Sequence, residues 1–209
     1  MPRGTQAIIG LNVIVFLLQQ QAALSDQLII SFALWPLDSG AIQAAFGPGI
    51  SFAPWQLITY GFLHGGFTHI FFNMFAVYMF GSALEQFFGT RYYVALYFVS
   101  IVAAGLTQLG VNALLGSPEP TVGASGGVYG LLLAFAVYFP QQRIALIFLP
   151  VPIPARIFVA GYALIELFLG VTGTQAGVAH FAHLGGMLGA FLMIQWRRGK
   201  PPSMRGRRR

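Results

Sequence analysis

Six long apolar stretches constrain this chain more than any other feature of its sequence. They are Gln6–Leu24, Phe67–Phe88, Tyr92–Leu115, Ser125–Phe139, Ile157–Val171 and Phe181–Trp196. A helix of about 20 apolar residues crosses the hydrocarbon core of a bilayer. Only 8% of the 209 residues are charged, against about a quarter in soluble domains, which is too few to cover a water-exposed surface. The sequence therefore predicts an all-α, polytopic membrane protein with six transmembrane helices.

The basic residues indicate how these helices are oriented. Arg3 precedes the first stretch, and Arg91 separates the second from the third. Arg143 and Arg156 lie between the fourth and the fifth, and the other seven of the eleven basic residues follow Trp196. The remaining loops contain no lysine or arginine, so the positive-inside rule predicts that both termini are cytoplasmic. A bacterial inner membrane is the expected location.

We expect one membrane domain, residues 1–196, followed by a tail, residues 197–209, that reads RRGKPPSMRGRRR. A basic tail after an apolar helix favours contact with anionic membrane lipids. Nucleic acid is not expected as a partner, because no folded basic face accompanies the tail. The first stretch could instead be a signal peptide, with Arg3 before a short apolar core. Removal of a signal peptide would place the new N-terminus on the outer side, which disagrees with the distribution of the basic residues.

Two connecting segments have unusual compositions. The first outer loop, Ser25–Gly66, is long and poor in charge, with Trp35 and Trp55 among prolines and glycines. Indole rings settle at membrane interfaces, so we expect a long, irregular, interfacial element there; an ordinary loop in the aromatic belt is the alternative. The second segment, Phe148–Arg156, contains three prolines and is predicted to be a cytoplasmic turn, because proline is excluded from helix interiors.

Five hydrogen-bonding side chains are expected to share one depth below the outer surface. The second, fourth and sixth stretches run from outside to inside, and each begins with such residues. These are His69 and Asn73, Ser125 and Tyr129, and His183. The members of the first two pairs are four residues apart, so each pair shares a helical face. Polar groups in hydrocarbon are costly unless they turn toward partners or a wet cavity, which makes all five candidates for a site.

A serine and a histidine at one depth can act as a nucleophile and its base. Ser125 needs a base to become nucleophilic, and histidines are the only bases expected at its depth. Asparagine and histidine side chains, with the Ser125 N–H at a helix N-terminus, could form an oxyanion hole. Glu85 and Glu166 are expected to lie deeper or toward the cytoplasm, which leaves no acid as a third member. The sequence therefore predicts a dyad of Ser125 and His183.

Glycines around the serine allow a second interpretation of the same motif. The stretch PTVGASGGVYG contains the GxxxG pair Gly126 and Gly130, and a second pair, Gly185 and Gly189, lies in the sixth stretch. Small residues at this spacing let membrane helices approach closely. Alone, the serine motif is explained equally well by packing. Its combination with polar residues at the same depth favours catalysis.

Four motifs follow one another along the chain: HGGFTHIFFNM, FGSALEQFFGTR, GASGGVYG and AHLGGMLGA. They begin at His64, Phe80, Gly123 and Ala182. In this order they resemble the rhomboid family of intramembrane serine proteases, from the second stretch to the sixth. The resemblance implies a six-helix bundle, without cofactor or metal, that cleaves transmembrane segments of single-span or polytopic membrane proteins near the outer face.

The resemblance also implies roles for individual residues. Ser125 would attack the scissile carbonyl, and His183 would act first as general base and then as general acid. His69, Asn73 and the Ser125 N–H would stabilise the oxyanion. Tyr129 would pack on the ring of the catalytic histidine. The supporting glycines are Gly123, Gly126 and Gly186, of which the last would bring the fourth and sixth helices together.

Some positions depart from the family pattern. Gln56 follows Trp55 where the family commonly has arginine, so the anchoring of the first outer loop is expected to differ. Ala190 stands where the sixth-helix pattern has glycine, which predicts slightly wider packing. Glu85 and Arg91 fit the family's polar pattern at the cytoplasmic end of the second helix. No seventh helix or extra domain is expected, which corresponds to the minimal six-span form.

Two other functions remain open from the residues alone. The histidines, His64, His69, His180 and His183, all lie toward the outer face and could hold a metal or haem iron. Against this, no HExxH motif is present and no carboxylate is expected nearby. His64 and His180 are also expected in or beside loops, as solvated or capping side chains. The second alternative is a non-enzymatic membrane protein that binds transmembrane clients or conducts a small solute.

Overall fold

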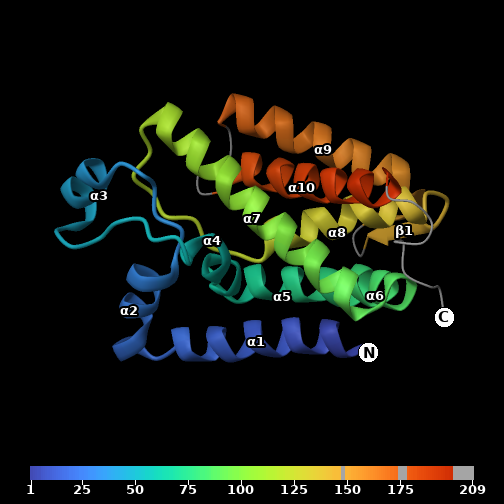
Figure 1. The fold of residues 1–209 in the computed structure, drawn as a ribbon, viewed down its shortest axis with the longest axis horizontal. Coiled ribbons are helices and arrows are strands. Elements are labelled where there is room, and N and C mark those ends of the chain that lie inside the picture. Colours follow the sequence, from blue (N-terminus) through green and yellow to red (C-terminus); the bar gives the residue numbers. More distant parts are fainter. Residues whose placement is uncertain (147–148, 174–177, 200–209) are drawn as a thin grey trace.

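The computed structural model describes residues 1–146, 149–173 and 178–199. Its elements are α1 (Arg3–Gln19), α2 (Ala22–Phe32), α3 (Ser39–Phe46), α4 (Gln56–Thr59), the 3₁₀ turn η1 (Tyr60–Phe62), α5 (Phe67–Ala76), the π-helical turn η2 (Val77–Gly81), α6 (Ser82–Phe88), α7 (Thr90–Leu115), α8 (Ser125–Tyr138), β1 (Arg143–Leu146), β2 (Leu149–Pro154), α9 (Ala155–Thr172) and α10 (His180–Gly199). In Figure 1 the helices α7, α8 and α10 occupy the middle of the bundle, between α9 on one side and α5, α6 and α1 on the other.

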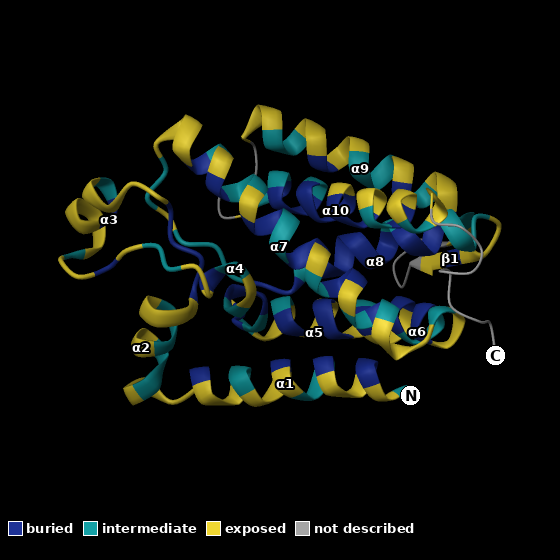
Figure 2. Cartoon of the chain, viewed as in Figure 1, coloured by how far each residue is buried: buried dark blue, intermediate teal, exposed yellow. Residues whose placement is uncertain are grey.

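The three central helices pack through small residues. Figure 2 shows α8 and much of α10 as buried, whereas α1 and α9 expose one face. A methyl group on Gly126 of α8 would lie 2.4 Å from the Ala104 Cβ of α7. A methyl group on Gly185 of α10 would lie 2.3 Å from the Thr107 Oγ1 of α7. Both GxxxG pairs therefore lie where helix backbones come close, as the spacing predicts.

Three helices are long and apolar enough to cross a membrane: Phe67–Phe88, which runs from α5 through η2 to α6, together with α7 and α9. Large apolar side chains on them, such as Phe71 and Phe168, are exposed. Such side chains suit contact with lipid, so the chain is an integral membrane protein. Among the described residues, α1 and α8 are shorter than such a span and α10 is not apolar enough, so the full set of six spans stays a prediction.

The first apolar stretch and the loop after it are built differently from the expectation. The stretch Gln6–Leu24 is split, because α1 ends at Gln19 and α2 begins at Ala22. The loop is irregular only in part, since it contains α2, α3 and α4 around a small apolar core of Trp35, Ile42 and Ile50. Asp38 caps the N-terminus of α3 by accepting hydrogen bonds from two backbone N–H groups, a local signal for a helix start.

Gln56 anchors this loop from inside. Its side chain is buried, with Oε1 accepting a hydrogen bond from the Trp35 N–H (3.2 Å) and Nε2 donating to the Ser51 carbonyl (3.3 Å). A glutamine amide can accept and donate at once, which an arginine cannot. The departure at this position therefore leaves the loop anchored, by an amide in place of a guanidinium.

A two-stranded hairpin corrects both the all-α expectation and the turn expected before α9. Strands β1 and β2 pair antiparallel, with Arg143 opposite Pro154 and Ile144 opposite Ile153. Proline fixes an extended-compatible φ and is tolerated at the edges of sheets, so a segment unable to form a helix interior can still form a strand. Phe148, within the predicted turn, lies outside the described residues.

Glu85 ties α1 to the end of the α5–α6 span opposite to His69. Its buried carboxylate accepts hydrogen bonds from the backbone N–H groups of Gly4 (2.8 Å) and Thr5 (2.7 Å). The hydroxyls of Thr5 (2.8 Å) and Thr90 (2.7 Å) donate to the same carboxylate. An acid at a helix N-terminus satisfies free N–H groups and the helix dipole together. This end of the bundle also holds the hairpin and the C-terminal end of α10 (Figure 1).

Candidate active site

Ser125 and His183 form a direct hydrogen bond between α8 and α10. The Ser125 Oγ lies 2.9 Å from the His183 Nε2. Ser125 is the first residue of α8, and His183 lies in the first turn of α10. The segment before the serine is fixed by a two-way backbone bridge between Leu34 and Thr121, with distances of 3.0 and 2.9 Å. The structured first outer loop thus positions the serine.

Gly123 brings a second histidine beside the serine. Its φ is +130°, a backbone conformation that favours glycine, and its N–H donates to the Tyr60 carbonyl at 2.9 Å. A methyl group at this position would lie 2.8 Å from the His69 Nε2 and 3.7 Å from the Ser125 Oγ. Glycine is therefore required both for the turn and for the close approach of the His69 ring.

The hydrogen bonds of His69 define which of its ring nitrogens can donate a proton. The Gly65 N–H points at the His69 Nδ1, at 3.3 Å, so Nδ1 is the acceptor nitrogen and Nε2 carries the proton. That Nε2–H faces the Gly123 and Ser125 side of the ring. One turn later, the Asn73 Nδ2 donates to the His69 carbonyl at 2.9 Å, which leaves its second N–H for another acceptor. Both residues can thus supply donors, and His69 supplies its own beside the serine.

Tyr129 and Gly186 complete the contact between α8 and α10. The Tyr129 ring stacks on the His183 ring, with centroids 4.1 Å apart and planes 7° from parallel. A methyl group on Gly186 would lie 2.1 Å from the Gly126 carbonyl oxygen. The two backbones therefore touch one residue after Ser125, where only glycine fits. Ala190, at the later position of the pattern, is fully buried in the core.

Glu166 overturns the expectation that no acid lies near the histidine. Its Oε2 lies 2.9 Å from the His183 Nδ1 and 2.7 Å from the His180 Nδ1. Its Oε1 accepts a hydrogen bond from the Tyr129 hydroxyl. The expectation failed because α9 runs toward the outer end of the bundle and Glu166 lies in its second half, six residues or about 9 Å before its last residue. The direction of the fifth stretch, from the cytoplasmic to the outer side, was therefore the feature of the sequence that could have placed Glu166 near the histidine.

The expected surroundings of His180 and His64 are also corrected. Both side chains are buried, neither solvated nor exposed in a loop. His180 is the first residue of α10 and bonds Glu166, so a carboxylate does accompany the histidines. Ligand atoms of Glu166, His180 and His183 lie within 4.8 Å of one another. This set, and not the four histidines, is the group of described residues that could hold a metal ion.

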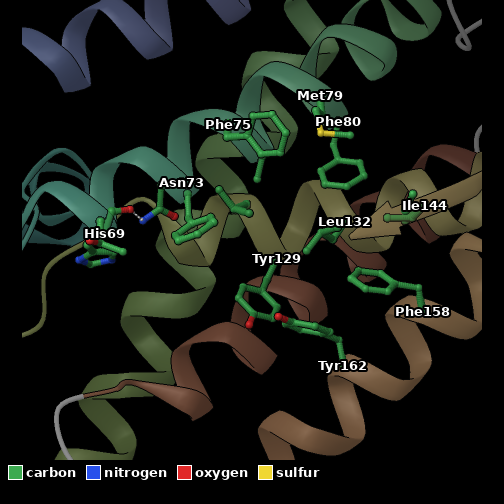
Figure 3. Close-up of a pocket in the computed structure, with 15 residues that line it drawn as sticks. His69, Asn73, Phe75, Met79, Phe80, Tyr129, Leu132, Ile144, Phe158 and Tyr162 are labelled. Atoms are coloured by element: carbon green, nitrogen blue, oxygen red, sulfur yellow. Dashed lines mark hydrogen bonds between the residues drawn. The ribbon is translucent and has the colours of Figure 1, made fainter. Parts of the chain in front are cut away.

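Two cavities meet at this site. An apolar cavity of about 860 Å³ lies between α5, α8 and α9, with His69 and Asn73 toward one end, Tyr129 in its middle and Phe158 among its apolar walls (Figure 3). A second cavity, of about 950 Å³, is lined by His69, Ser125 and His183 together with polar residues of the outer segments, among them Gln108, Asn112 and Glu119. His69 lines both cavities, so the apolar cavity and the polar cavity adjoin at its ring.

His64 makes the stability of this region dependent on pH. Burial, with the nearby His69 second, lowers the pKa of His64 from the usual 6.5 to about 4, partly opposed by the Phe62 carbonyl. The unfolded chain then binds a proton that the folded chain excludes. We expect stability to fall as the pH drops from about 6.5 toward about 4, measured as thermal unfolding in detergent. His64→Phe keeps a ring and removes the titration, so its profile should be flatter; an equally steep profile would contradict this assignment.

Comparisons with known proteins identify the family of this chain. Residues 51–198 match the rhomboid domain. The chain is 32% identical over 142 residues to "Rhomboid protein 1, mitochondrial" of Saccharomyces cerevisiae, covering 64% of this chain and 39% of that protein. It is 30% identical over 190 residues to the mouse "Presenilin-associated rhomboid-like protein, mitochondrial", covering 89% and 46%. It is 31% identical over 137 residues to "Rhomboid protease GluP" of Bacillus subtilis, covering 66% and 25%.

The chain spans less than half the length of each of these relatives. They include mitochondrial and bacterial proteins, so the expected bacterial inner membrane stays a proposal. The match to the rhomboid domain nevertheless covers most of the chain and contains Ser125, Glu166 and His183. This chain therefore belongs to the rhomboid family.

Proposed function

We propose that this protein is an intramembrane serine endopeptidase. The observation that carries the proposal is the 2.9 Å hydrogen bond between the Ser125 Oγ and the His183 Nε2, in the wall of the polar cavity. A serine hydroxyl bonded to a histidine nitrogen is the arrangement that activates a serine nucleophile. The relative from Bacillus subtilis carries the word protease in its name, which fits the same activity.

The reaction follows from the donors around the serine. As the Ser125 Oγ bonds to the substrate carbonyl carbon, its proton passes to the His183 Nε2. The Ser125 N–H at the start of α8 has no partner within the helix, and it would hold the oxyanion together with the His69 Nε2–H and the Asn73 amide. The proton on His183 then goes to the leaving amine as the C–N bond breaks. Water then attacks the acyl-enzyme carbonyl and gives its proton to His183, and that proton returns to the Ser125 Oγ as the acyl group is released.

The two cavities suit the two reactants. The apolar cavity beside His69 and Asn73 fits a transmembrane segment of a single-span or polytopic membrane protein. Such a segment must be locally unwound, because an intact helix keeps its carbonyls hydrogen-bonded. The polar cavity beside Ser125 can admit the water that hydrolyses the acyl-enzyme. Six spans, with both termini cytoplasmic and cleavage near the outer face, belong to the same proposal.

Labelling with a fluorophosphonate tests the proposal directly. The probe forms an Oγ–P bond with an activated serine and releases fluoride. We expect labelling of the wild type at Ser125, found by mass spectrometry of the labelled peptide, and no labelling of Ser125→Ala. Ser100 is the internal comparison and should stay unlabelled, because it is buried in α7 with its hydroxyl bonded to the Leu96 carbonyl. Labelling that persists in Ser125→Ala would refute the nucleophile and favour a non-enzymatic client-binding protein.

A metal-dependent activity is the second candidate, because Glu166, His180 and His183 bring three ligand atoms together. Two histidines and a carboxylate are ligands that zinc accepts. Chelation separates the two candidates. The serine mechanism predicts unchanged cleavage after treatment with EDTA followed by removal of the chelator. Loss of cleavage that added zinc restores would favour the metal.

A further inference from the structure

Two carboxylates are buried in the described part of this chain, and one of them touches the candidate site. Glu85 caps α1 at the far end of the α5–α6 span, whereas Glu166 lies between the site residues of α8 and α10. Both oxygens of Glu166 are engaged. Its Oε1 accepts from Tyr129, and its Oε2 contacts the Nδ1 atoms of both His180 and His183.

The hydrogens in this cluster fix the tautomer of His183. An ionised carboxylate can only accept, so each of its three partners donates a proton. His183 therefore carries its proton on Nδ1, and its Nε2 has a free lone pair. That lone pair faces the Ser125 Oγ at 2.9 Å. A neutral histidine with the opposite tautomer would present an N–H to the serine and could not accept its proton.

The same carboxylate fixes the plane of the imidazole. Tyr129 stacks on His183 at 4.1 Å, and the Tyr129 hydroxyl is held by Glu166. His180 approaches the carboxylate on the same oxygen as His183, at 2.7 Å. Residues from α8 and α10 thus hold the side chain that α9 supplies. Tyr129, His180 and His183 thus all contact one buried carboxylate and restrict its orientation.

We propose that Glu166 is a positioning residue of the reaction, the third member of a triad with His183 and Ser125, and that Tyr129 and His180 hold its carboxylate in place. This inference rests on the proposed serine mechanism. Glu166 accepts the His183 Nδ1–H throughout and stays ionised, so it stabilises the imidazolium that forms when His183 takes the serine proton. The serine proton goes to Nε2 and then to the leaving amine, and none passes to Glu166.

Glu166→Gln tests the proposal with little change in volume. The glutamine amide can place an N–H against the His183 Nδ1 and select the wrong tautomer; in a serine protease the equivalent acid-to-amide change costs about 10⁴ in kcat. We expect kcat and the rate of fluorophosphonate labelling to fall at least about 10²-fold, with KM within a few-fold. Glu85→Gln is the matched control, the other buried glutamate, and its folded fraction should keep wild-type kcat and labelling.

Two outcomes would overturn the triad while leaving the serine mechanism intact. One is a folded Glu166→Gln protein with wild-type labelling and kcat, beside an inactive Ser125→Ala protein. The other does not depend on a variant folding. Nitrogen-15 NMR of the wild type, with its four histidines labelled, should show the neutral His183 ring protonated at Nδ1 and bare at Nε2. A proton on Nε2 with none on Nδ1 would exclude Glu166 as the residue that sets the tautomer. Cleavage by Ser125→Ala would instead refute the proposed function itself.

Discussion

Replacement of Ser125 by alanine, or of His183 by alanine, is expected to abolish cleavage of a single-span substrate. The Ser125 Oγ forms the new bond and the His183 Nε2 receives its proton, and the two atoms are hydrogen-bonded in the resting protein. Loss of either member of such a unit costs about 10⁶ in kcat. The measurement is cleavage in detergent and in liposomes, followed on gels, with folding checked by thermal unfolding. Since the two residues act as one unit, the double variant should be no worse than either single one.

Asn73→Ala is expected to reduce cleavage less than Ser125→Ala does. Asn73 offers a donor to the oxyanion and takes no part in bond formation, and one such donor is worth about 10²–10³ in kcat. We therefore expect residual cleavage that exceeds that of Ser125→Ala. Complete loss in a folded Asn73→Ala protein would contradict a role limited to the oxyanion. Substantial cleavage by Ser125→Ala would contradict the nucleophile.

The sequence predicted much of this site because topology and helix spacing place residues at a depth. Ser125 and His183 were expected together since each begins a stretch that runs inward from the same face. In the structure their side chains are directly hydrogen-bonded to each other. Apolar length also located the later helices well, since α8 and α9 begin and end within two residues of the predicted stretches. These inferences depend on properties that are local to each helix.

The parts that sequence reasoning missed depend on contacts between distant segments. The helices of the first outer loop are held by the side chains of Trp35 and Gln56, whose partners no local pattern reveals. The hairpin before α9 contains prolines, which exclude a helix but do not by themselves indicate a strand. Glu166 was placed at the wrong depth. Its true position could have been found by following the direction of α9, but its three donors come from two other helices.

The contact between α8 and α10 is therefore the feature that both the chemistry and the fold require. His183 is held on one side by the Tyr129 ring and on its edge by Glu166. All of these contacts require the two backbones to stay at the short separation that Gly126 and Gly186 permit. A change that separates the helices would alter the Ser125–His183 distance without touching either reacting side chain.

Gly186→Ala is expected to lower cleavage at least about 10²-fold, since a displacement of about 1 Å at a reacting centre can cost that much. The added methyl group would lie 2.1 Å from the Gly126 carbonyl oxygen and 2.8 Å from its carbon. Backbone atoms cannot rotate away, so α10 must move from α8. Overpacking of this kind also costs about 1–3 kcal/mol of stability. Gly186→Val should remove cleavage altogether.

Gly110→Ala is the matched control for this separation. Gly110 lies in α7 and is exposed, and a methyl group there would meet no atom within 4 Å. Alanine is favoured over glycine in a helix by about 1 kcal/mol, so this variant should be at least as stable as the wild type and fully active. Fluorophosphonate labelling reports the nucleophile itself and should be lost with cleavage in Gly186→Ala. Normal labelling and cleavage in that variant would mean that the bundle absorbs the methyl group elsewhere, and that the Gly126–Gly186 contact does not set the distance between the serine and its base.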